Sequence, residues 1–316
     1  MALKLSLVVP CYNEEENIRA FYDETVKAFE GCGYEYELVM VNDGSKDGTG
    51  LEMKRLFTEK KNVSHLTMVH FSRNFGKEAA ILAGMRHAKG EMVTFIDADL
   101  QQRPEIARHM VEILDENPEY DCVAAYQDER KEGKKISFLK KSFYKIINKV
   151  SEVDFVNGAS DFRTCRRVMA DAILSLPEYQ RFSKGIFSWV GFDTYYIPYV
   201  VEERHAGTTK WSFWKLVQYA MEGIIGFSTK PLRLTTFFGM ISSILSVVYF
   251  LVVVIKRIAL GVDVPGYASI IALVLLIGGI QMLMLGIIGE YLSRMYIQGK
   301  NRPIYIEKQV QSTQEE

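Results

Sequence analysis

Two long stretches without a charged residue lie in the last third of this 316-residue sequence. The first, Leu234–Ile255, has 22 residues, and the second, Tyr267–Gly289, has 23. A helix needs about 20 apolar residues to cross the hydrocarbon core of a bilayer. Two buried core helices are the alternative, but too little of the chain lies beside these stretches to cover them. The pattern therefore predicts two membrane-spanning helices joined by a short loop.

Positive charges are distributed unevenly around this predicted hairpin. Only Lys256 and Arg257 lie in the connecting loop, whereas the two outer flanks are rich in lysine and arginine. Cytoplasmic segments of membrane proteins carry an excess of these residues. The sequence therefore predicts that both flanks, both termini and all residues before the first span lie on the cytoplasmic side. The flanking cations are Lys210, Lys215, Lys230, Arg233, Arg294, Lys300, Arg302 and Lys308.

Two further segments are predicted to contact the membrane surface. Residues 211–232 are rich in aromatic residues and precede the first span, which favours an interfacial helix over one packed on the soluble part. Between Lys131 and Lys149, lysines alternate with apolar residues, as in helices attracted to anionic lipid; a solvated helix face is the alternative. The predicted divisions are a soluble domain (1–210), an interfacial segment (211–232), a hairpin (233–290) and a cytoplasmic tail (291–316).

The soluble part alternates between short apolar runs and helix-like segments. This alternation is typical of an α/β fold, with a mostly parallel sheet and helices on both faces. In such sheets, ligands bind beyond the carboxyl ends of the strands. The apolar runs are Leu5–Val9, Leu38–Val41, Leu66–Phe71, Met92–Ile96 and Cys122–Ala125, and the helix-like segments are Glu14–Phe29, Thr49–Thr58, Lys77–Ala88 and Pro104–Leu114.

Polar residues follow three of these predicted strands. Pro10-Cys11-Tyr12-Asn13-Glu14 follows the first, Asn42-Asp43-Gly44-Ser45 the second and Asp97-Ala98-Asp99 the fourth. The glycine-rich motifs G-x-G-x-x-G and G-x-x-x-x-G-K-[ST] do not occur near them, so the usual backbone cradles for phosphate are missing. Two aspartates at i and i+2 can instead bind a hard divalent ion that neutralises a diphosphate. The D-x-D pattern alone is weak evidence for a metal site, but three polar strand ends together predict a ligand site.

These motifs resemble those of the inverting family 2 glycosyltransferases of the GT-A fold, through Val8–Glu14, Val41–Ser45 and Asp97–Asp99. The resemblance extends to the polyprenyl phosphate branch, which includes dolichol phosphate mannose synthases and bactoprenol glucosyltransferases. The two predicted spans are similar to those of the bactoprenol type, so the resemblance covers nearly the whole chain. The motifs that resemble this branch are Phe71–Glu78, Ala98–Gln101 and Asp161–Arg163.

The resemblance implies a role for each matching residue. Asp97, Asp99 and Gln101 are implied to hold Mg²⁺ or Mn²⁺ and the diphosphate, with Asp99 acting catalytically on the departing group. Gln102-Arg103-Pro104 departs from the family pattern, in which His-Pro follows the metal-side glutamine. With only two spans, and Gln180-Arg181-Phe182 in place of Q-x-x-R-W, a processive polysaccharide synthase is disfavoured. The residues expected to bind the nucleotide are Pro10, Tyr12, Asn13, Glu14 and Asp43.

Other residues are assigned to the reaction and to the acceptor. A lipid phosphate is largely dianionic at neutral pH, so it can attack the sugar without a strong base. Asp161 is predicted to hold a sugar hydroxyl or assist the acceptor while Arg163 orients an anion, with a structural Asp–Arg pair as the alternative. Lys77 is predicted to face the donor diphosphate from a helix amino terminus, or else solvent. Arg204 and Lys210 are predicted to bind the lipid phosphate or, alternatively, only to attract headgroups.

The sequence thus predicts an enzyme of the bacterial cytoplasmic membrane that transfers a hexose to polyprenyl phosphate for cell-envelope glycosylation. UDP-glucose is the first expected donor, with UDP-N-acetylglucosamine and GDP-mannose as alternatives. A non-catalytic nucleotide-sugar-binding subunit is the rival, disfavoured by the D-x-D motif. The net charge of −1 argues against a nucleic-acid partner. A homo-oligomer is expected from small residues in the spans, such as Ser242 and Gly286, and a flippase partner is expected to move the loaded lipid.

Overall fold

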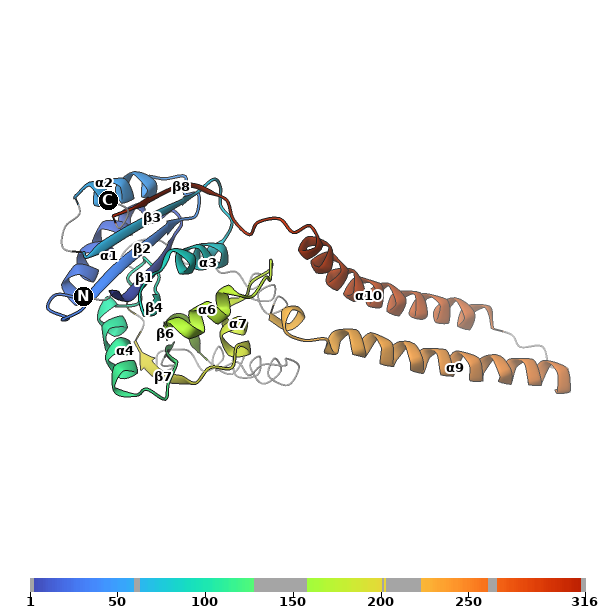
Figure 1. Cartoon of the computed structure of the whole chain (residues 1–316). Coiled ribbons are helices and arrows are strands. Elements are labelled where there is room, and N and C mark those ends of the chain that lie inside the picture. The colour runs from blue at the N-terminus through green and yellow to red at the C-terminus, as the bar shows by residue number, and fades with distance from the viewer. Residues whose placement is uncertain are drawn as a thin grey trace.

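The computed structural model describes residues 3–59, 63–127, 158–200, 202, 223–260 and 266–313. The basic stretch 131–149, most of the interfacial segment 211–232, and both Arg204 and Lys210 lie outside the described residues. Within them, an α/β domain continues into two long helices that extend away from it (Figure 1).

Eight strands form one sheet in the described part of the chain, in the order β7-β5-β6-β4-β1-β2-β3-β8. Only β6 and β8 run antiparallel to their neighbours, so the predicted mostly parallel α/β sheet is confirmed. The strands are β1 (Leu3–Cys11), β2 (Glu35–Asn42), β3 (His65–Phe71), β4 (Met92–Phe95), β5 (Cys122–Gln127), β6 (Ala159–Arg166), β7 (Thr194–Tyr199) and β8 (Glu307–Ser312).

Helices cover both faces of the sheet because successive side chains of a strand point to opposite faces. In β1, Leu5 and Leu7 are fully buried in the cluster that includes α1 (Glu15–Ala28), α2 (Thr49–Glu59) and α4 (Pro104–Glu116). Val8 belongs to the cluster on the other face, with α3 (Lys77–His87), α6 (Arg167–Leu174) and α7 (Ser183–Trp189). Burying a side chain of this size contributes about 1.5–3 kcal/mol, so both helical layers are held mainly by apolar packing.

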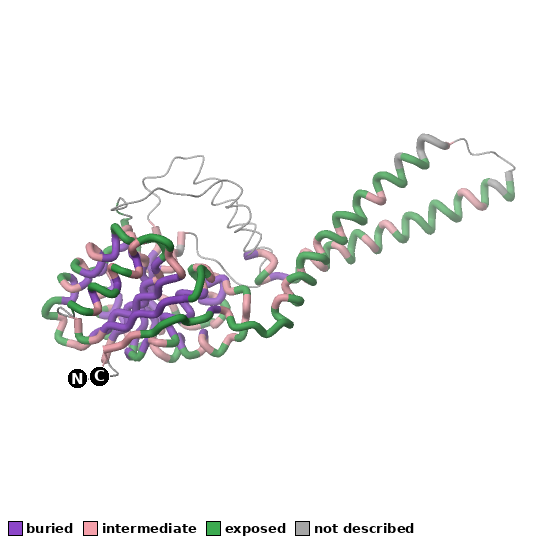
Figure 2. Tube along the Cα trace, turned by 90° about the horizontal axis from the view of Figure 1, so that it is seen from above, coloured by how far each residue is buried: buried purple, intermediate pink, exposed green. Residues whose placement is uncertain are grey.

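The two long helices are α9 (Lys230–Leu260) and α10 (Tyr267–Gly299). Each is long and apolar enough to cross a membrane, and none of its most apolar window is buried inside the protein. Figure 2 shows both helices exposed along most of their length, in contrast to the buried sheet. Thus they are not core helices. The second helix continues to Gly299, beyond the predicted span, and in this part Glu290 and Arg294 form an i,i+4 ion pair at 3.6 Å.

The residues after α10 return to the α/β domain. β8 pairs antiparallel with β3, with Thr67 opposite Ser312 and Phe71 opposite Glu307, and Figure 1 shows the two strands side by side. The segment 291–316, predicted as a cytoplasmic tail, therefore includes two structured parts: residues 291–299 belong to α10 and residues 307–312 to the sheet. The prediction missed β8 because an edge strand can be held by backbone hydrogen bonds and needs no buried apolar face.

Candidate active site

The polar loops after β1 and β2 meet at the carboxyl edge of the sheet, because the two strands are parallel neighbours. The backbone N–H of Asn13 donates to Ser45 Oγ at 3.0 Å, and Asn13 Oδ1 accepts from the Lys46 N–H at 2.9 Å. Asn13 has a φ of 57°, in the left-handed region that asparagine tolerates well. This backbone conformation and the two hydrogen bonds fix one loop against the other.

Three predicted nucleotide-binding residues lie in or next to the loop after β1. Pro10 is partly buried at the end of the strand, whereas the Tyr12 ring is 43% exposed. The Glu14 N–H donates to Thr49 Oγ1 at 2.8 Å, and a Glu14 carboxylate oxygen accepts from the Asn17 amide at 2.6 Å. An exposed aromatic ring beside a fixed acid provides a surface on which a planar base can stack.

Asp43 holds the loop that leads into α3. Its carboxylate is 3% exposed and accepts backbone N–H groups from Phe75 at 2.6 Å and Gly76 at 2.9 Å. Burial raises the pKa of Asp43 above its ordinary value, although the two backbone hydrogen bonds oppose that effect. The structure therefore gives Asp43 a role in shaping the site, and its contact with a nucleotide stays a prediction.

Lys77, the first residue of α3, lies between two carboxylates. Its Nζ is 2.7 Å and 2.8 Å from the two Asp97 oxygens and 3.4 Å from Asp161 Oδ2. The sheet register explains the arrangement: β6 is antiparallel to β4 with Arg163 opposite Phe95, so Asp161 and Asp97 reach the same edge. We call Lys77, Asp97 and Asp161 the Lys77 cluster. Sequence analysis did not predict these two ion pairs, and a contact between Lys77 and the donor diphosphate stays a prediction.

Lys77 and Asp161 stabilise each other's charged forms. Burial by itself lowers the pKa of Lys77, but Asp97 and Asp161 outweigh it and raise that pKa. Burial raises the pKa of Asp161, yet Lys77, followed by Lys184, brings it below its ordinary value. Asp161 Oδ1 is buried and has no hydrogen-bond partner among the described residues. An ionised acceptor of this kind is suited to a hydroxyl donor such as that of a sugar.

Arg163 does not form the pair with Asp161 that the sequence suggested as an alternative, because the ion pair of Asp161 is with Lys77. The Arg163 side chain is buried, its guanidinium lies 3.7 Å from the centroid of the Phe187 ring, and one of its N–H groups donates to the Ser160 carbonyl at 2.9 Å. These contacts hold β6 against α7. Arg163 therefore supports the Lys77 cluster from the core.

Asp99 and Gln101 lie in the loop after β4. The Gln101 N–H donates to Asp99 Oδ1 at 3.2 Å, and the Gln101 side-chain amide donates to the Glu202 carbonyl at 3.4 Å. The intervening Leu100 has a φ of 59°, an unusual backbone conformation for leucine that projects the two polar side chains from a tight turn.

A divalent ion at this loop would need some of its ligands from the bound substrate. Within the described ranges, no three His, Cys, Asp or Glu side chains are grouped as a metal site. Mg²⁺ is often bound by one or two carboxylates together with substrate phosphates. The hard oxygens of Asp99 and Gln101 fit such an ion, whereas Asp97 is already neutralised by Lys77. Metal binding by the predicted set of Asp97, Asp99 and Gln101 stays a prediction.

Glu78 is a buried acid to which the sequence analysis gave no role. Its two oxygens accept the Ser183 N–H, each at 3.1 Å, and Oε2 also accepts the Ser183 hydroxyl. Burial, and next the negative charge of Asp161, raise the pKa of Glu78 to about 7. The signal available in the sequence was its place beside Lys77 in the Phe-Gly-Lys-Glu motif. Glu78 joins α3 to the start of α7.

Replacing Glu78 with glutamine is expected to remove a pH dependence of stability. The folded pKa of about 7 lies above the ordinary 4.5, so the folded state holds the proton more tightly. The stabilisation of the folded state by protonated Glu78 is complete below pH 4.5 and is lost as the pH rises through 7. Relative to Glu78→Gln, the wild type should lose about 1 kcal/mol per pH unit in this window. Thermal unfolding midpoints in detergent, measured at several pH values, report this difference. If the midpoints of the wild type and Glu78→Gln change with pH in parallel, the expectation is contradicted.

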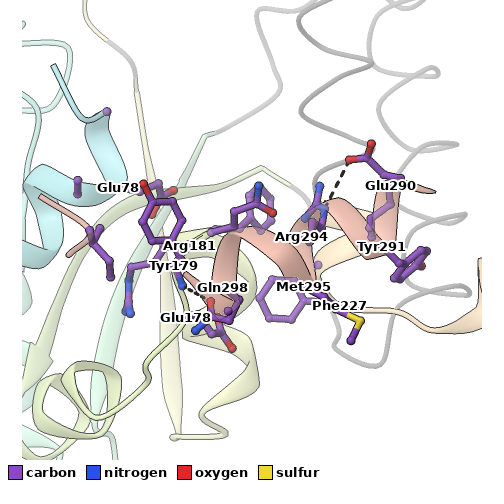
Figure 3. A pocket seen from close by; sticks show the side chains of 18 of the residues that line it. Glu78, Glu178, Tyr179, Arg181, Phe227, Glu290, Tyr291, Arg294, Met295 and Gln298 are labelled. Atoms are coloured by element: carbon purple, nitrogen blue, oxygen red, sulfur yellow. Dashed lines mark hydrogen bonds and ion pairs between the residues drawn. The ribbon is translucent and has the colours of Figure 1, made fainter. Parts of the chain in front are cut away.

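A cavity of about 1730 Å³ lies between the α/β domain and α10 (Figure 3). One wall is the loop before α3 together with Lys77 and Glu78, and a second is the segment 178–182. The third wall is α10, which contributes the apolar residues Leu283 and Ile287 and, nearer its end, polar and charged side chains. The cavity thus extends from Lys77, which also contacts Asp97 and Asp161, to a helix surface that is apolar enough to lie in a membrane.

Family models match both parts of the chain. Residues 6–174 match the model "Glycosyl transferase family 2", and residues 230–295 match "GtrB C-terminal hairpin". Among curated proteins, the "Putative glycosyltransferase CsbB" of Bacillus subtilis is 42% identical, over 96% of this chain and 91% of that one. The "Prophage bactoprenol glucosyl transferase homolog" of Escherichia coli is 42% identical, over 98% and 99%. The "Bactoprenol glucosyl transferase" of Shigella phage SfII is also 42% identical, over 97% and 98%.

Solved structures share the fold at lower identity. The mannosyltransferase PcManGT from Pyrobaculum calidifontis, in complex with GDP-Man and Mn²⁺, has a TM-score of 0.51 and 18% identity, over 92% of this chain and 88% of that one. Glucosyl-3-phosphoglycerate synthase from Mycobacterium tuberculosis, with Mn²⁺, UDP and phosphoglyceric acid, also has a TM-score of 0.51 and 18% identity, over 71% and 76%. The predicted family and its bactoprenol-type hairpin are confirmed: this chain belongs to glycosyl transferase family 2, with a GT-A α/β domain followed by a GtrB-type hairpin.

Proposed function

We propose that this glycosyltransferase moves a hexose from a nucleotide sugar to polyprenyl phosphate at the cytoplasmic face of a bacterial membrane. The observation that carries the proposal is the cavity that extends from Lys77 to the apolar surface of α10. A water-soluble acceptor has no need of such a path. The names of the bactoprenol glucosyl transferase relatives support the same acceptor, and they favour UDP-glucose as the first donor to test.

On the donor side, the exposed Tyr12 ring and Glu14 are proposed to bind the nucleoside. Mg²⁺ or Mn²⁺ held by Asp99 and Gln101 would supply positive charge to the diphosphate when bound. Asp161 Oδ1, which has no hydrogen-bond partner among the described residues, is proposed to accept a hydroxyl of the sugar. With these contacts the sugar would lie at the Lys77 cluster, next to the end of the cavity that Lys77 lines.

The chemical step is a displacement at the anomeric carbon. An oxygen of the lipid phosphate dianion forms a bond to that carbon, and the bond to the diphosphate breaks with its electron pair leaving on the diphosphate oxygen. No proton needs to move when the acceptor is a dianion. The protein holds the lipid phosphate and the leaving diphosphate on opposite sides of the anomeric carbon. Such positioning can increase the rate by several powers of ten. In-line attack on an α-linked donor gives a β-linked product.

The acceptor is proposed to lie with its phosphate near the polar end of the cavity and its isoprenoid chain along α10. Leu283 and Ile287 supply the apolar wall, while Arg181 lines the cavity near its polar end. Arg204 and Lys210, which lie outside the described residues, remain proposed ligands of the lipid phosphate.

The pairing of β3 with β8 supports a hairpin that leaves and re-enters one side of the membrane, because β3 precedes α9 and β8 follows α10. The excess of lysine and arginine in both flanks favours the cytoplasmic side. The homo-oligomer and the flippase partner remain predictions from the sequence.

Purified protein in detergent or nanodiscs is expected to release nucleoside diphosphate only when polyprenyl phosphate and Mg²⁺ or Mn²⁺ are both present. Parallel incubations with UDP-glucose, UDP-N-acetylglucosamine and GDP-mannose identify the donor by its release rate. Binding of a donor without release under any of these conditions would favour the non-catalytic subunit instead. Release that is independent of lipid would contradict the proposed acceptor.

A further inference from the structure

The end of α10 and the strand that follows it are attached to the α/β domain at several points. We call residues 298–313 the carboxy-terminal strap. Beyond the backbone pairing of β8 with β3, the hydroxyls of Thr67 and Ser312 are hydrogen-bonded at 3.0 Å. The Leu66 N–H donates to Thr313 Oγ1 at 2.9 Å. The strap therefore adds a strand to the sheet and does not merely lie against it.

Tyr305 connects the strap to the loop that lines the cavity. Its side chain is 8% exposed, and its ring stacks on Phe71 with centroids 4.9 Å apart and an interplanar angle of 13°. Phe71 in turn packs edge-on against Phe75, which belongs to the cavity wall, at 5.7 Å. The Ser72 N–H donates to the Ile306 carbonyl at 3.0 Å. The loop before Lys77 is thus packed on the strap.

The strap also holds the other end of α3. The Arg86 guanidinium donates to the Tyr305 hydroxyl at 3.1 Å and lies over its ring at 5.3 Å. His87 Nε2 is 2.8 Å from Glu307 Oε1. Lys77 is the first residue of α3. The strap therefore contacts the chain both before Lys77, through Phe71, and after it, through Arg86 and His87.

On the opposite wall of the cavity, Gln298 fastens the last turn of α10. Its Oε1 accepts the Tyr179 N–H at 2.8 Å (Figure 3). Its Nε2 donates to the Pro177 carbonyl at 2.9 Å. Seven residues before Gln298 in α10, the Tyr291 hydroxyl donates to the Ser228 carbonyl at 2.7 Å. Helix α10 is consequently joined to the cavity wall at 178–182 and to Ser228, just before α9.

We infer that the carboxy-terminal strap positions α10 against the α/β domain, so that an acceptor held in the membrane reaches the Lys77 cluster. This inference rests on the proposed function. An acceptor whose chain is in the bilayer has its height and direction set by α10, whereas the sugar is placed by α3 and the sheet. The strap is the covalent and packed link between the two, and misplacing a reacting group by about 1 Å can cost about 100-fold in rate. Tyr305 and Gln298 are its positioning residues.

The test compares two acceptors with the full-length protein in nanodiscs: a long polyprenyl phosphate held in the bilayer and a ten-carbon isoprenyl phosphate that dissolves in water. For Tyr305→Ala we expect about a 10-fold loss of kcat/KM with the long acceptor, mainly through its apparent KM, and less than about a twofold loss with the short one. Tyr305→Phe keeps the stacked ring and should restore the wild-type ratio of the two rates. Gln298→Ala should shift the ratio in the same direction as Tyr305→Ala.

Gln309→Ala, an exposed position on the same strand, is the matched control and should leave both rates unchanged. Donor affinity, measured by calorimetry without lipid, should be that of the wild type in every variant. Equal losses with both acceptors, or a collapse of donor affinity, would show that the strap only stabilises the fold. Wild-type rates in both Tyr305→Ala and Gln298→Ala would also overturn the inference. If the wild-type protein glycosylates neither acceptor, the proposed function itself fails.

Discussion

Asp99→Asn is expected to reduce kcat by at least about 10³-fold while leaving the protein folded. The substitution keeps the shape of the side chain and its contact with the Gln101 N–H, but it removes the negative charge that would bind a divalent ion. The loss should persist at saturating donor and acceptor because charge on the departing diphosphate develops during the reaction. Rates with Mg²⁺ and with Mn²⁺ measure the effect.

The control for this substitution is a measurement of metal and nucleotide binding. Calorimetric titration of Mn²⁺ into the protein with nucleoside diphosphate should show strong coupling between the two ligands in the wild type and little in Asp99→Asn. Asp97→Asn should retain that coupling, because Lys77 already engages the Asp97 carboxylate. Transfer by Asp99→Asn at near wild-type rate with metal present would refute the role of this loop.

Lys77→Gln is expected to lower kcat by about 10²-fold or more, since it removes the cation that lies between Asp97 and Asp161. Two neighbouring carboxylates cannot both stay fully ionised, so one pKa rises. We expect the pKa of Asp161 to increase, which weakens it as an acceptor for the sugar hydroxyl. The pH–rate profile of the variant should therefore show a loss of activity toward acidic pH that the wild type lacks.

A double-mutant cycle separates this explanation from a general loss of structure. Combining Lys77→Gln with Asp161→Asn removes both charges of one ion pair, so the combined loss should be smaller than the product of the two single losses. Lys89→Gln, at an exposed lysine just after α3, should have no effect. Fully multiplicative losses for the pair would mean that Lys77 and Asp161 act independently.

Local sequence patterns were sufficient to predict the sheet and the loops at its carboxyl edge. The alternation of apolar runs with amphipathic segments identified β1 to β5 and α1 to α4, and the direction of parallel strands then placed the loops containing Asn13 and Asp99 at one edge. This inference needs only strand periodicity and topology. The same reasoning could not orient Asp161, because nothing local shows that β6 runs antiparallel to β4.

The remaining features depend on contacts between distant parts of the chain. Lys77 lies 20 residues from Asp97, and Glu78 lies 105 residues from Ser183. β8 has no alternating apolar pattern, and the stacking of Tyr305 on Phe71 exists only once the chain returns from the membrane helices. The carboxylate partners of Lys77 could not be predicted from the sequence, because they are set by the tertiary fold.

The most direct test of the proposed activity is the structure of the lipid formed in the acceptor-dependent incubation. With UDP-glucose labelled with ¹³C at the anomeric carbon, mass spectrometry and NMR of the extracted lipid report its composition and configuration. We predict one hexose joined through its anomeric carbon to the phosphate of the polyprenyl chain, in the β configuration. An α-linked sugar would contradict direct in-line attack, and a lipid without sugar, while nucleotide is still consumed, would contradict transfer to polyprenyl phosphate.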